Sequence, residues 1–203
     1  MFDFQNLKRI GSGRFRVAHI HPENNQLVVK TCKKDDKVSI RKCVQMMRDE
    51  IQAAQKFPQL FPKVFNITPD GKSMVVERAN ILVPSHQDFL ISNYFPELQG
   101  YFIKSGAKDF MDFLHKIIEQ LLIRKNQAGR REIKTYNPTK FFKNSPGKII
   151  RRAMTNHLFV DIFEATIELD IDYFDIDWGN IGISVVDGRF MIVDASMMSG
   201  FKA

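Results

Sequence analysis

The sequence is poor in cysteine and contains no long hydrophobic run. Only Cys32 and Cys43 occur among its 203 residues. Two cysteines are too few for a disulfide framework or a zinc site, so a reducing cytoplasm is the default expectation. No apolar run approaches the roughly 20 residues of a membrane span, and the N-terminus lacks the pattern of a signal peptide. We therefore expect a cytoplasmic protein without contact to a membrane.

The chain does have enough apolar residues to bury a core. Hydrophobic residues make up 44% of the sequence, which suits one domain or two small lobes. Residues 1–79 show strand patterns around one helix, and residues 80–203 are mainly helical. Strands are expected at Val64–Ile67 and Ser73–Glu77. In the second part, helices are expected over Asp109–Arg124 and Lys148–Leu169.

The most informative segment lies near the C-terminus, where Phe174-Asp175-Ile176-Asp177-Trp178-Gly179-Asn180 precedes Phe190-Met191-Ile192-Val193-Asp194. An aspartate, an asparagine five residues later and an aspartate after an apolar strand are groups that phosphoryl transfer needs. Asp175 can accept or orient a hydroxyl proton, while Asn180 and Asp194 offer oxygen ligands to Mg²⁺. A turn at Asp187 and Gly188 places the two ligand positions at neighbouring ends of a hairpin.

A second motif stands near the N-terminus, in Ile10-Gly11-Ser12-Gly13-Arg14-Phe15-Arg16 and Val28-Val29-Lys30. Apolar runs on both sides of residues 21–25 predict a β-hairpin. Gly11 and Gly13 let a backbone approach phosphate oxygens closely, and Lys30 at the end of a buried strand can reach them. A glycine pair before a strand is also typical of a plain turn. This motif therefore depends on the others for its interpretation.

A helix is expected from Ser39, as its N-cap, to about Phe57. Its buried face is defined by residues with 3-4-3 spacing: Val44, Met47, Ile51 and Ala54. Glu50 borders that face, whereas Asp49 points away from it. We therefore expect Glu50 to turn inward and pair with Lys30. The alternative is a solvated charge, which is ordinary for a glutamate on a helix.

Together these motifs resemble the protein kinase family. The resemblance covers a Gly-rich loop, a strand lysine, a helix glutamate, a hinge-like segment, a catalytic loop and a metal aspartate. The matching positions, in that order, are Gly11, Gly13 and Phe15, then Lys30, Glu50, Glu77 to Ala79, Asp175 with Asn180, and Asp194. Among kinases, the sequence is most similar to the small serine/threonine kinases of short-tailed bacteriophages. The likeness spans nearly the whole chain through scattered motifs.

The resemblance implies an α+β, two-lobed protein kinase-like fold with a truncated C-terminal lobe. Residues 1–79 would form the sheet-rich lobe and residues 80–203 the helical lobe, with ATP and Mg²⁺ between them. It also implies phosphorylation of serine or threonine in host proteins, in the cytoplasm of an infected cell. The implied roles are phosphate binding by Lys30, orientation of Lys30 by Glu50, positioning of the acceptor hydroxyl by Asp175, metal binding by Asn180 and Asp194, and adenine contact by the backbone from Glu77 to Ala79.

The sequence departs from the kinase pattern at several points. Arg16 occupies the place of the third glycine, and Asp177 stands where protein kinases usually carry a lysine. Asp194 is followed by Ala195 and Ser196 instead of Phe-Gly, and only nine residues follow it, so a normal activation segment is not expected. A degenerate kinase scaffold that binds a host target without phosphoryl transfer is the alternative. A small-molecule kinase is a third option, but that family usually has a histidine at Asp177.

The net charge of +7 invites a nucleic-acid interpretation. Basic residues do cluster, for example from Lys148 to Arg152. These clusters lack the interleaved aromatic residues of a single-strand-binding groove, and no helix-turn-helix or zinc pattern is present. We therefore expect the charge to steer ATP and an acidic protein partner, and not to bind nucleic acid.

Overall fold

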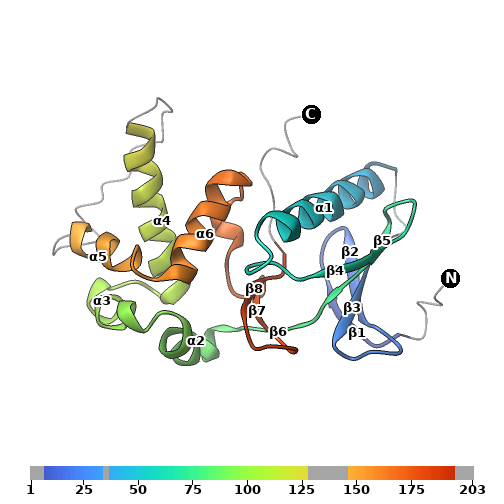
Figure 1. The fold of residues 1–203 in the computed structure, drawn as a ribbon, viewed down its shortest axis with the longest axis horizontal. Coiled ribbons are helices and arrows are strands. Elements are labelled where there is room, and N and C mark those ends of the chain that lie inside the picture. Colours follow the sequence, from blue (N-terminus) through green and yellow to red (C-terminus); the bar gives the residue numbers. More distant parts are fainter. Residues whose placement is uncertain (1–6, 34–36, 128–145, 195–203) are drawn as a thin grey trace.

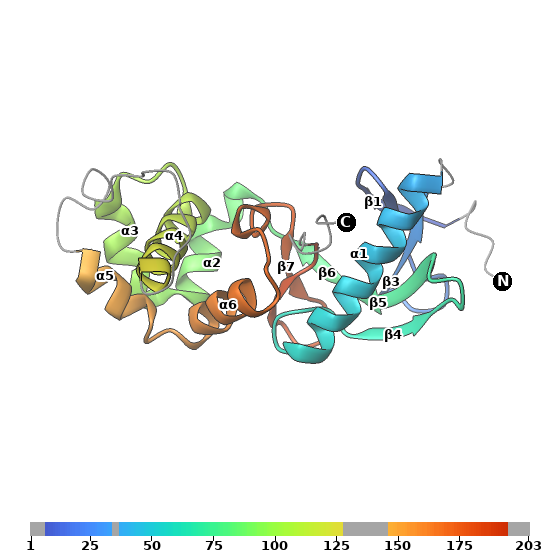
Figure 2. The same cartoon turned by 90° about the horizontal axis from the view of Figure 1, so that it is seen from above.

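The computed structural model of the chain describes residues 7–33, 37–127 and 146–194. Within these residues the protein is a mixed α+β fold with two antiparallel sheets and a group of helices. The five-stranded sheet and the helices α2 to α6 lie at opposite ends of the molecule, with the three-stranded sheet between them (Figure 1 and Figure 2).

The first sheet has five antiparallel strands in the order β1-β2-β3-β5-β4. Their bounds are Arg9–Ser12 for β1, Arg16–Ile20 for β2, Leu27–Cys32 for β3, Val64–Ile67 for β4 and Ser73–Glu77 for β5. The expected hairpin is present, because β2 pairs with β3 and places Ala18 opposite Lys30. The two strands expected later in this part have the bounds that the sequence predicted.

Helix α1 (Lys37–Lys56) contributes to the small core of the first sheet. It begins two residues before Ser39, the expected N-cap. Its buried residues are Cys43, Met47 and Ala53, while the expected Val44, Ile51 and Ala54 are only partly buried. The buried face is therefore rotated slightly from the expected one, because Cys43 joins Met47 in the core cluster with Val28, Met74 and Val76.

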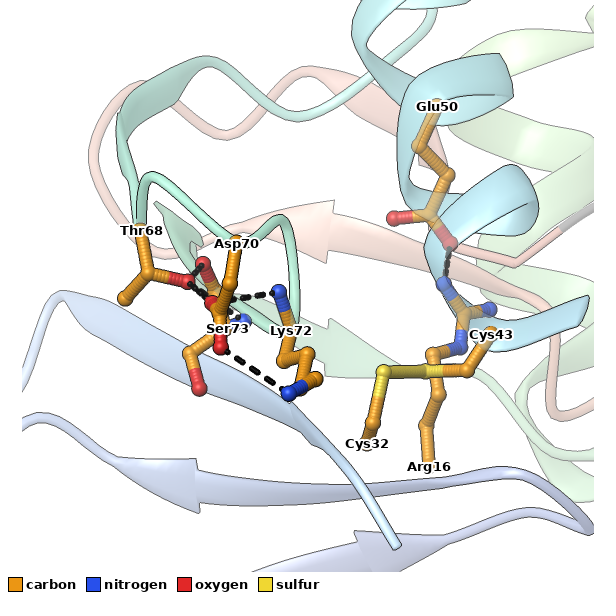
Figure 3. The surroundings of a disulfide bond; sticks show 8 residues. All are labelled: Arg16, Cys32, Cys43, Glu50, Thr68, Asp70, Lys72 and Ser73. Carbon is orange, nitrogen blue, oxygen red and sulfur yellow. Dashed lines mark hydrogen bonds and ion pairs between the residues drawn. A yellow bond between two sulfur atoms is a disulfide. The ribbon is translucent and has the colours of Figure 1, made fainter. Parts of the chain in front are cut away.

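A disulfide between Cys32 and Cys43 joins the end of β3 to the first half of α1, with a Cα–Cα distance of 5.8 Å (Figure 3). The sequence analysis treated two cysteines as too few for a disulfide framework and did not predict this single bond. Cys32 is two residues after Lys30, and Cys43 is seven residues before Glu50. It therefore ties the strand that carries the lysine to the helix that carries the glutamate.

The second sheet has the order β6-β7-β8, with bounds Ala79–Ile81, Ile181–Ser184 and Phe190–Ile192. The close approach of β6 and β7 requires glycine at Gly182. A Cβ atom there would lie 2.8 Å from both the Ala79 Cβ and the Asn80 carbonyl oxygen. This sheet thus brings residues near 80 against residues near 180.

Five further helices complete the described fold: α2 (Gln87–Tyr94), α3 (Gln99–Ser105), α4 (Phe110–Gln127), α5 (Pro146–Ala153) and α6 (His157–Glu168). Short 3₁₀ turns occur at η2 (Pro84–His86), η3 (Pro96–Leu98) and η5 (Tyr173–Asp175). In the ranges that the structure describes, no helix combines the length and apolarity needed to cross a bilayer.

The prediction of a single helix over Lys148–Leu169 is wrong, because the structure has two helices there, α5 and α6. Asn156 separates them. Its side-chain oxygen accepts a hydrogen bond from the Phe159 amide at 2.8 Å, and its Nδ2 donates to the Tyr94 carbonyl at 2.8 Å. An asparagine N-cap starts a new helix in this way because its side chain satisfies an amide that lacks a helical partner.

The main apolar core lies among the helices and the second sheet. It contains several fully buried aromatic side chains: Phe95, Phe110, Phe113 and Phe159. Ala53 and Phe57, from the end of α1 and just after it, also belong to this core. The boundary expected after residue 79 falls within β6, and the core extends across it through these α1 contacts.

Candidate nucleotide site

A cavity of about 390 Å³ is lined by both sheets and by the loop before β7. Six of the ten site positions named from the sequence line this cavity: Gly11, Lys30, Glu77, Ala79, Asn180 and Asp194. They come from segments up to 183 residues apart in the chain, and the fold gathers them around one space.

The cavity has walls of two kinds. The apolar lining consists of Ile10, Ala18, Val28, Pro62, Val76, Ala79, Ile81 and Val193. The polar lining includes Ser12, Lys30, Asn180 and Asp194. A space with an apolar wall and a few convergent polar groups is the usual form of a small-ligand site. The lining of this cavity suits a ligand with an apolar part and a charged part.

Lys30 is held by two acceptors at the edge of the cavity. Its Nζ lies 2.7 Å from Oε2 of Glu50 and donates to the Val193 carbonyl at 2.7 Å. The Lys30 and Glu50 side chains are only 12% and 14% exposed. Asp49 instead accepts a hydrogen bond from Gln45 at 2.8 Å. The pairing of Lys30 with Glu50 and not Asp49, expected from the helix pattern, is therefore present.

Arg16 makes contacts that the sequence analysis did not predict. Its guanidinium forms ion pairs with Oε1 of Glu50 and Oδ1 of Asp194. Burial lowers the pKa of Arg16, but the two carboxylates outweigh burial and raise the pKa above its ordinary value. Arg16 therefore stays charged and links the helix glutamate to the aspartate beyond β8. The only sequence signal was a basic residue in place of a glycine.

Asn180 and Asp194 are neighbours, as the hairpin predicted. Ile181 pairs with Ile192 across β7 and β8, and the Val193 amide donates to the Asn180 carbonyl at 2.8 Å. The Asn180 Nδ2 donates to the Asp175 carbonyl at 2.9 Å. This bond uses the nitrogen end of the Asn180 amide and therefore leaves its oxygen end as the atom for a cation.

These two residues fit a magnesium ion by their chemistry. Mg²⁺ prefers oxygen ligands and is usually bound through one or two carboxylates together with water and substrate phosphates. Asn180 offers an amide oxygen, and the Asp194 side chain is 43% exposed with Oδ1 bound to Arg16. Among the described residues there is no cluster of three or more His, Cys, Asp or Glu that could hold a metal by itself. A metal bound by Asn180 and Asp194 would also need oxygen atoms from water or from the phosphates of a bound substrate.

Helix α4 contacts the start of the loop from Asp175 to Asn180 through His115. The ring Nε2 of His115 lies 2.8 Å from the Ile176 carbonyl oxygen, and His115 packs edge-on against Tyr173 and Phe174. Burial, with help from Glu119 and Asp172, raises the pKa of Tyr173 to about 12. Tyr173 is therefore neutral at physiological pH and serves as packing for this loop.

Asp177, the acid at an unusual position, is used within the loop. Its Oδ1 accepts from the Trp178 amide at 2.7 Å, and its carbonyl accepts from the Asn180 amide at 2.9 Å. Gly179 follows with φ of 91°, a left-handed value that favours glycine. Asp177 does not line the cavity, so its carboxylate shapes the turn and does not face the candidate ligand.

Glu77 has a structural role that the sequence analysis missed. It is 3% exposed, and its carboxylate binds Arg189 at 2.5 and 2.7 Å and Ser184 at 2.5 Å. Burial raises the pKa of Glu77, but the bonds from Arg189, Ser184 and the Lys63 amide outweigh burial and lower the pKa. The side chain of Glu77 therefore joins the two sheets, and only the rest of the residue is available to a ligand.

Four named positions lie outside the cavity lining: Gly13, Phe15, Glu50 and Asp175. Phe15 packs against the small core of the first sheet, and Glu50 acts on the cavity through Lys30. Gly11 and Gly13 have no crowding from the chain: a Cβ at Gly11 would lie 3.8 Å from the Ala18 Cβ, and one at Gly13 would meet nothing within 4 Å. The packing of the chain alone does not explain these glycines.

No protein-family model matches this chain, and no curated protein shows significant similarity to it.

Proposed function

We propose that the protein binds ATP with Mg²⁺ in this cavity and transfers the terminal phosphoryl group to serine or threonine of another protein. The observation that supports this most is the composition of the cavity. A lysine paired with a helix glutamate, an asparagine, an aspartate and an unstrained glycine loop lie around one space with an apolar wall. These are the parts expected of a phosphoryl-transfer site in a two-lobed, kinase-like fold.

Each residue has a role in this proposal. Lys30 binds the phosphates, and its bond to Glu50 keeps Nζ directed toward them. Asn180 and Asp194 would hold Mg²⁺, which supplies positive charge to the phosphate oxygens when bound. Asp175 orients the acceptor hydroxyl and takes its proton as the oxygen attacks the terminal phosphorus and the bond to the leaving diphosphate breaks. The apolar wall near Ala79 accommodates the base.

The first test is nucleotide binding by calorimetry. We expect ADP and ATP to bind, and Lys30→Ala and Asp194→Ala each to weaken binding in the presence of Mg²⁺. Asp49→Ala is the matched control, because Asp49 neighbours Glu50 but bonds to Gln45. Unchanged affinity in both site variants would remove the assignment of this cavity as a nucleotide site.

The second test is transfer itself, with labelled ATP, Mg²⁺ and a lysate of the host as source of acceptor proteins. Asp175→Asn should abolish labelling and leave ADP affinity nearly unchanged, because orienting the hydroxyl belongs to the chemical step. A phage origin and host-protein targets come from the sequence resemblance alone. The lysate experiment identifies the acceptor by the protein that becomes labelled.

A second function is favoured by one contact. The ion pair between Arg16 and Asp194 engages the aspartate that a catalytic metal would need. A scaffold that binds nucleotide, or only its protein target, without transfer would tolerate that contact. In this case Asp175→Asn leaves the biological effect intact, whereas a kinase loses it, so the same variant separates the two functions.

A further inference from the structure

Arg16 holds two acidic groups of the candidate site at once. Its partners Glu50 and Asp194 lie 34 and 178 residues away along the chain. Figure 3 shows Arg16 beside the disulfide, reaching from the first sheet toward Glu50 on α1. The kinase pattern has a glycine at this position, so the resemblance assigns no role to this side chain.

Arg16 does not block the cavity. Its side chain is only 7% exposed, and it is not among the residues that line the space. Asp194 does line the cavity and is 43% exposed. One carboxylate therefore faces Arg16 with Oδ1 and the cavity with the rest of its surface. Arg16 therefore influences a ligand without contact, through its charge and through the carboxylates that it holds.

The charges of the site explain why this contact matters. Arg16 and Lys30 are cations, and Glu50 and Asp194 are anions, so the four side chains together are neutral. Without Arg16 the same group would carry a net negative charge. Such a group repels phosphate and attracts a divalent cation more strongly, and both effects are large where water is partly excluded.

We propose that Arg16 is a positioning residue that supplies, from within the chain, part of the positive charge that Mg²⁺ would bring to phosphates beside Asp194. The proposal rests on the nucleotide-binding function above and adds its dependence on metal. With Arg16 in place, Mg²⁺ binds less strongly at Asp194. Phosphates are also repelled less by the site when no Mg²⁺ is bound. The affinities for nucleotide and metal are therefore only weakly coupled.

The test measures that coupling on the full chain. ADP is titrated by calorimetry in excess Mg²⁺ and in EDTA, and the ratio of the two dissociation constants is the metal enhancement. We expect an enhancement below about tenfold for the wild type. For Arg16→Gln we expect it to rise by about tenfold or more, as loss of a unit charge a few ångströms away implies. Arg16→Lys keeps the charge and should remain near the wild type.

A control variant separates site charge from net charge. Arg14→Gln removes a positive charge from the turn just before β2, at an exposed residue that lies over the Phe15 ring at 5.2 Å, and should leave the enhancement unchanged. A readout without nucleotide supports the same point. Mn²⁺ should raise the melting temperature of Arg16→Gln more than that of the wild type, because Asp194 is then released to the metal.

Three results would overturn the proposal. Wild-type protein that binds ADP only in Mg²⁺ contradicts it directly, and this measurement holds even if Arg16→Gln does not fold. Equal enhancement in Arg16→Gln and Arg14→Gln means that Arg16 has a structural role alone. No ADP binding in either condition removes the proposed nucleotide site itself, and the inference with it.

Discussion

The sheet-rich region (residues 7–78) and the helical region (residues 79–194) are stabilised by different interactions. The buried apolar cluster that belongs to the first sheet is small and consists of Val28, Cys43, Met47, Met74 and Val76. The main core is much larger and rich in phenylalanine, with ring pairs such as Phe95 with Phe110 at 5.2 Å between centroids. The first region adds a disulfide and a buried network of charges.

This difference follows from what each region must hold. The sheet-rich region carries Arg16, Lys30 and Glu50 as a largely buried charged group beside the cavity, so apolar side chains cannot occupy these positions. Charges in a small core contribute little net stability, because their desolvation offsets much of their attraction. Burial of apolar area does contribute steadily with area. We therefore expect the helical region to be the more stable of the two, and the sheet-rich region to depend on its disulfide and ion pairs.

The largest effect is expected from Phe110→Ala in the helical region. Phe110 is fully buried, and its removal leaves a cavity among other rings. We expect the free energy of unfolding to fall by about 3–5 kcal/mol in urea denaturation. Ile103→Ala, at a side chain that is 72% exposed, should change it by less than about 0.5 kcal/mol. Equal effects of the two variants would contradict the assignment of the main core.

Reduction of the disulfide tests the other half of the comparison. Cys32 and Cys43 are 11 residues apart, and closing a loop of that size stabilises a fold by about 3 kcal/mol in the chain-entropy description. We expect dithiothreitol to lower the free energy of unfolding by roughly this amount. Hydrogen exchange should rise in β3 and α1 and stay low in α4. A Cys32→Ala, Cys43→Ala protein is the control, since the reductant should leave it unchanged.

The junction of the two regions should be sensitive to acid. The pKa of Glu77 is lowered by its bonds to Arg189 and Ser184 against the effect of burial. A lowered carboxylate pKa means that the stabilisation is complete above the ordinary value of 4.5 and is lost as pH falls through the folded value. The advantage of the wild type over Glu77→Gln in free energy of unfolding should therefore be constant above the ordinary value of 4.5 and shrink as the pH falls further, through the lower folded pKa. A constant difference would exclude Glu77 as the titrating group.

Local patterns predicted two contacts of the candidate site, and the resemblance grouped positions that line one cavity, but the long-range side-chain contacts of Arg16 and Glu77 were missed. The helix period placed Glu50 toward Lys30, and the hairpin pattern placed Asn180 beside Asp194, because both depend on residues close in sequence. The contact of Arg16 with Asp194 spans 178 residues, and no local pattern encodes it.

Other misses were of two kinds. The buried role of the Glu77 side chain depends on Arg189, which lies 112 residues away, so it was not visible from local sequence. The break between α5 and α6 had a local signal in Asn156, a preferred N-cap residue. The apolar pattern on both sides of Asn156 outweighed that signal. A prediction of the disulfide would have required the knowledge that the end of β3 lies against the first half of α1.

The smallest effect on stability is expected from Gly11→Ala. This variant separates residues that serve the candidate ligand site from residues that serve the fold. A Cβ at Gly11 would make only ordinary contact with Ala18 at 3.8 Å, so Gly11→Ala should change the free energy of unfolding by less than about 1 kcal/mol, in either direction. Gly11 lines the cavity, and an added methyl group there should weaken ADP binding measured by calorimetry. Gly182→Ala is the opposite case, because its Cβ would lie 2.8 Å from the Asn80 backbone and should destabilise the fold. If Gly11→Ala instead lowers the free energy of unfolding by more than about 1 kcal/mol and leaves the ADP affinity of the folded protein unchanged, this glycine serves the fold and not the ligand.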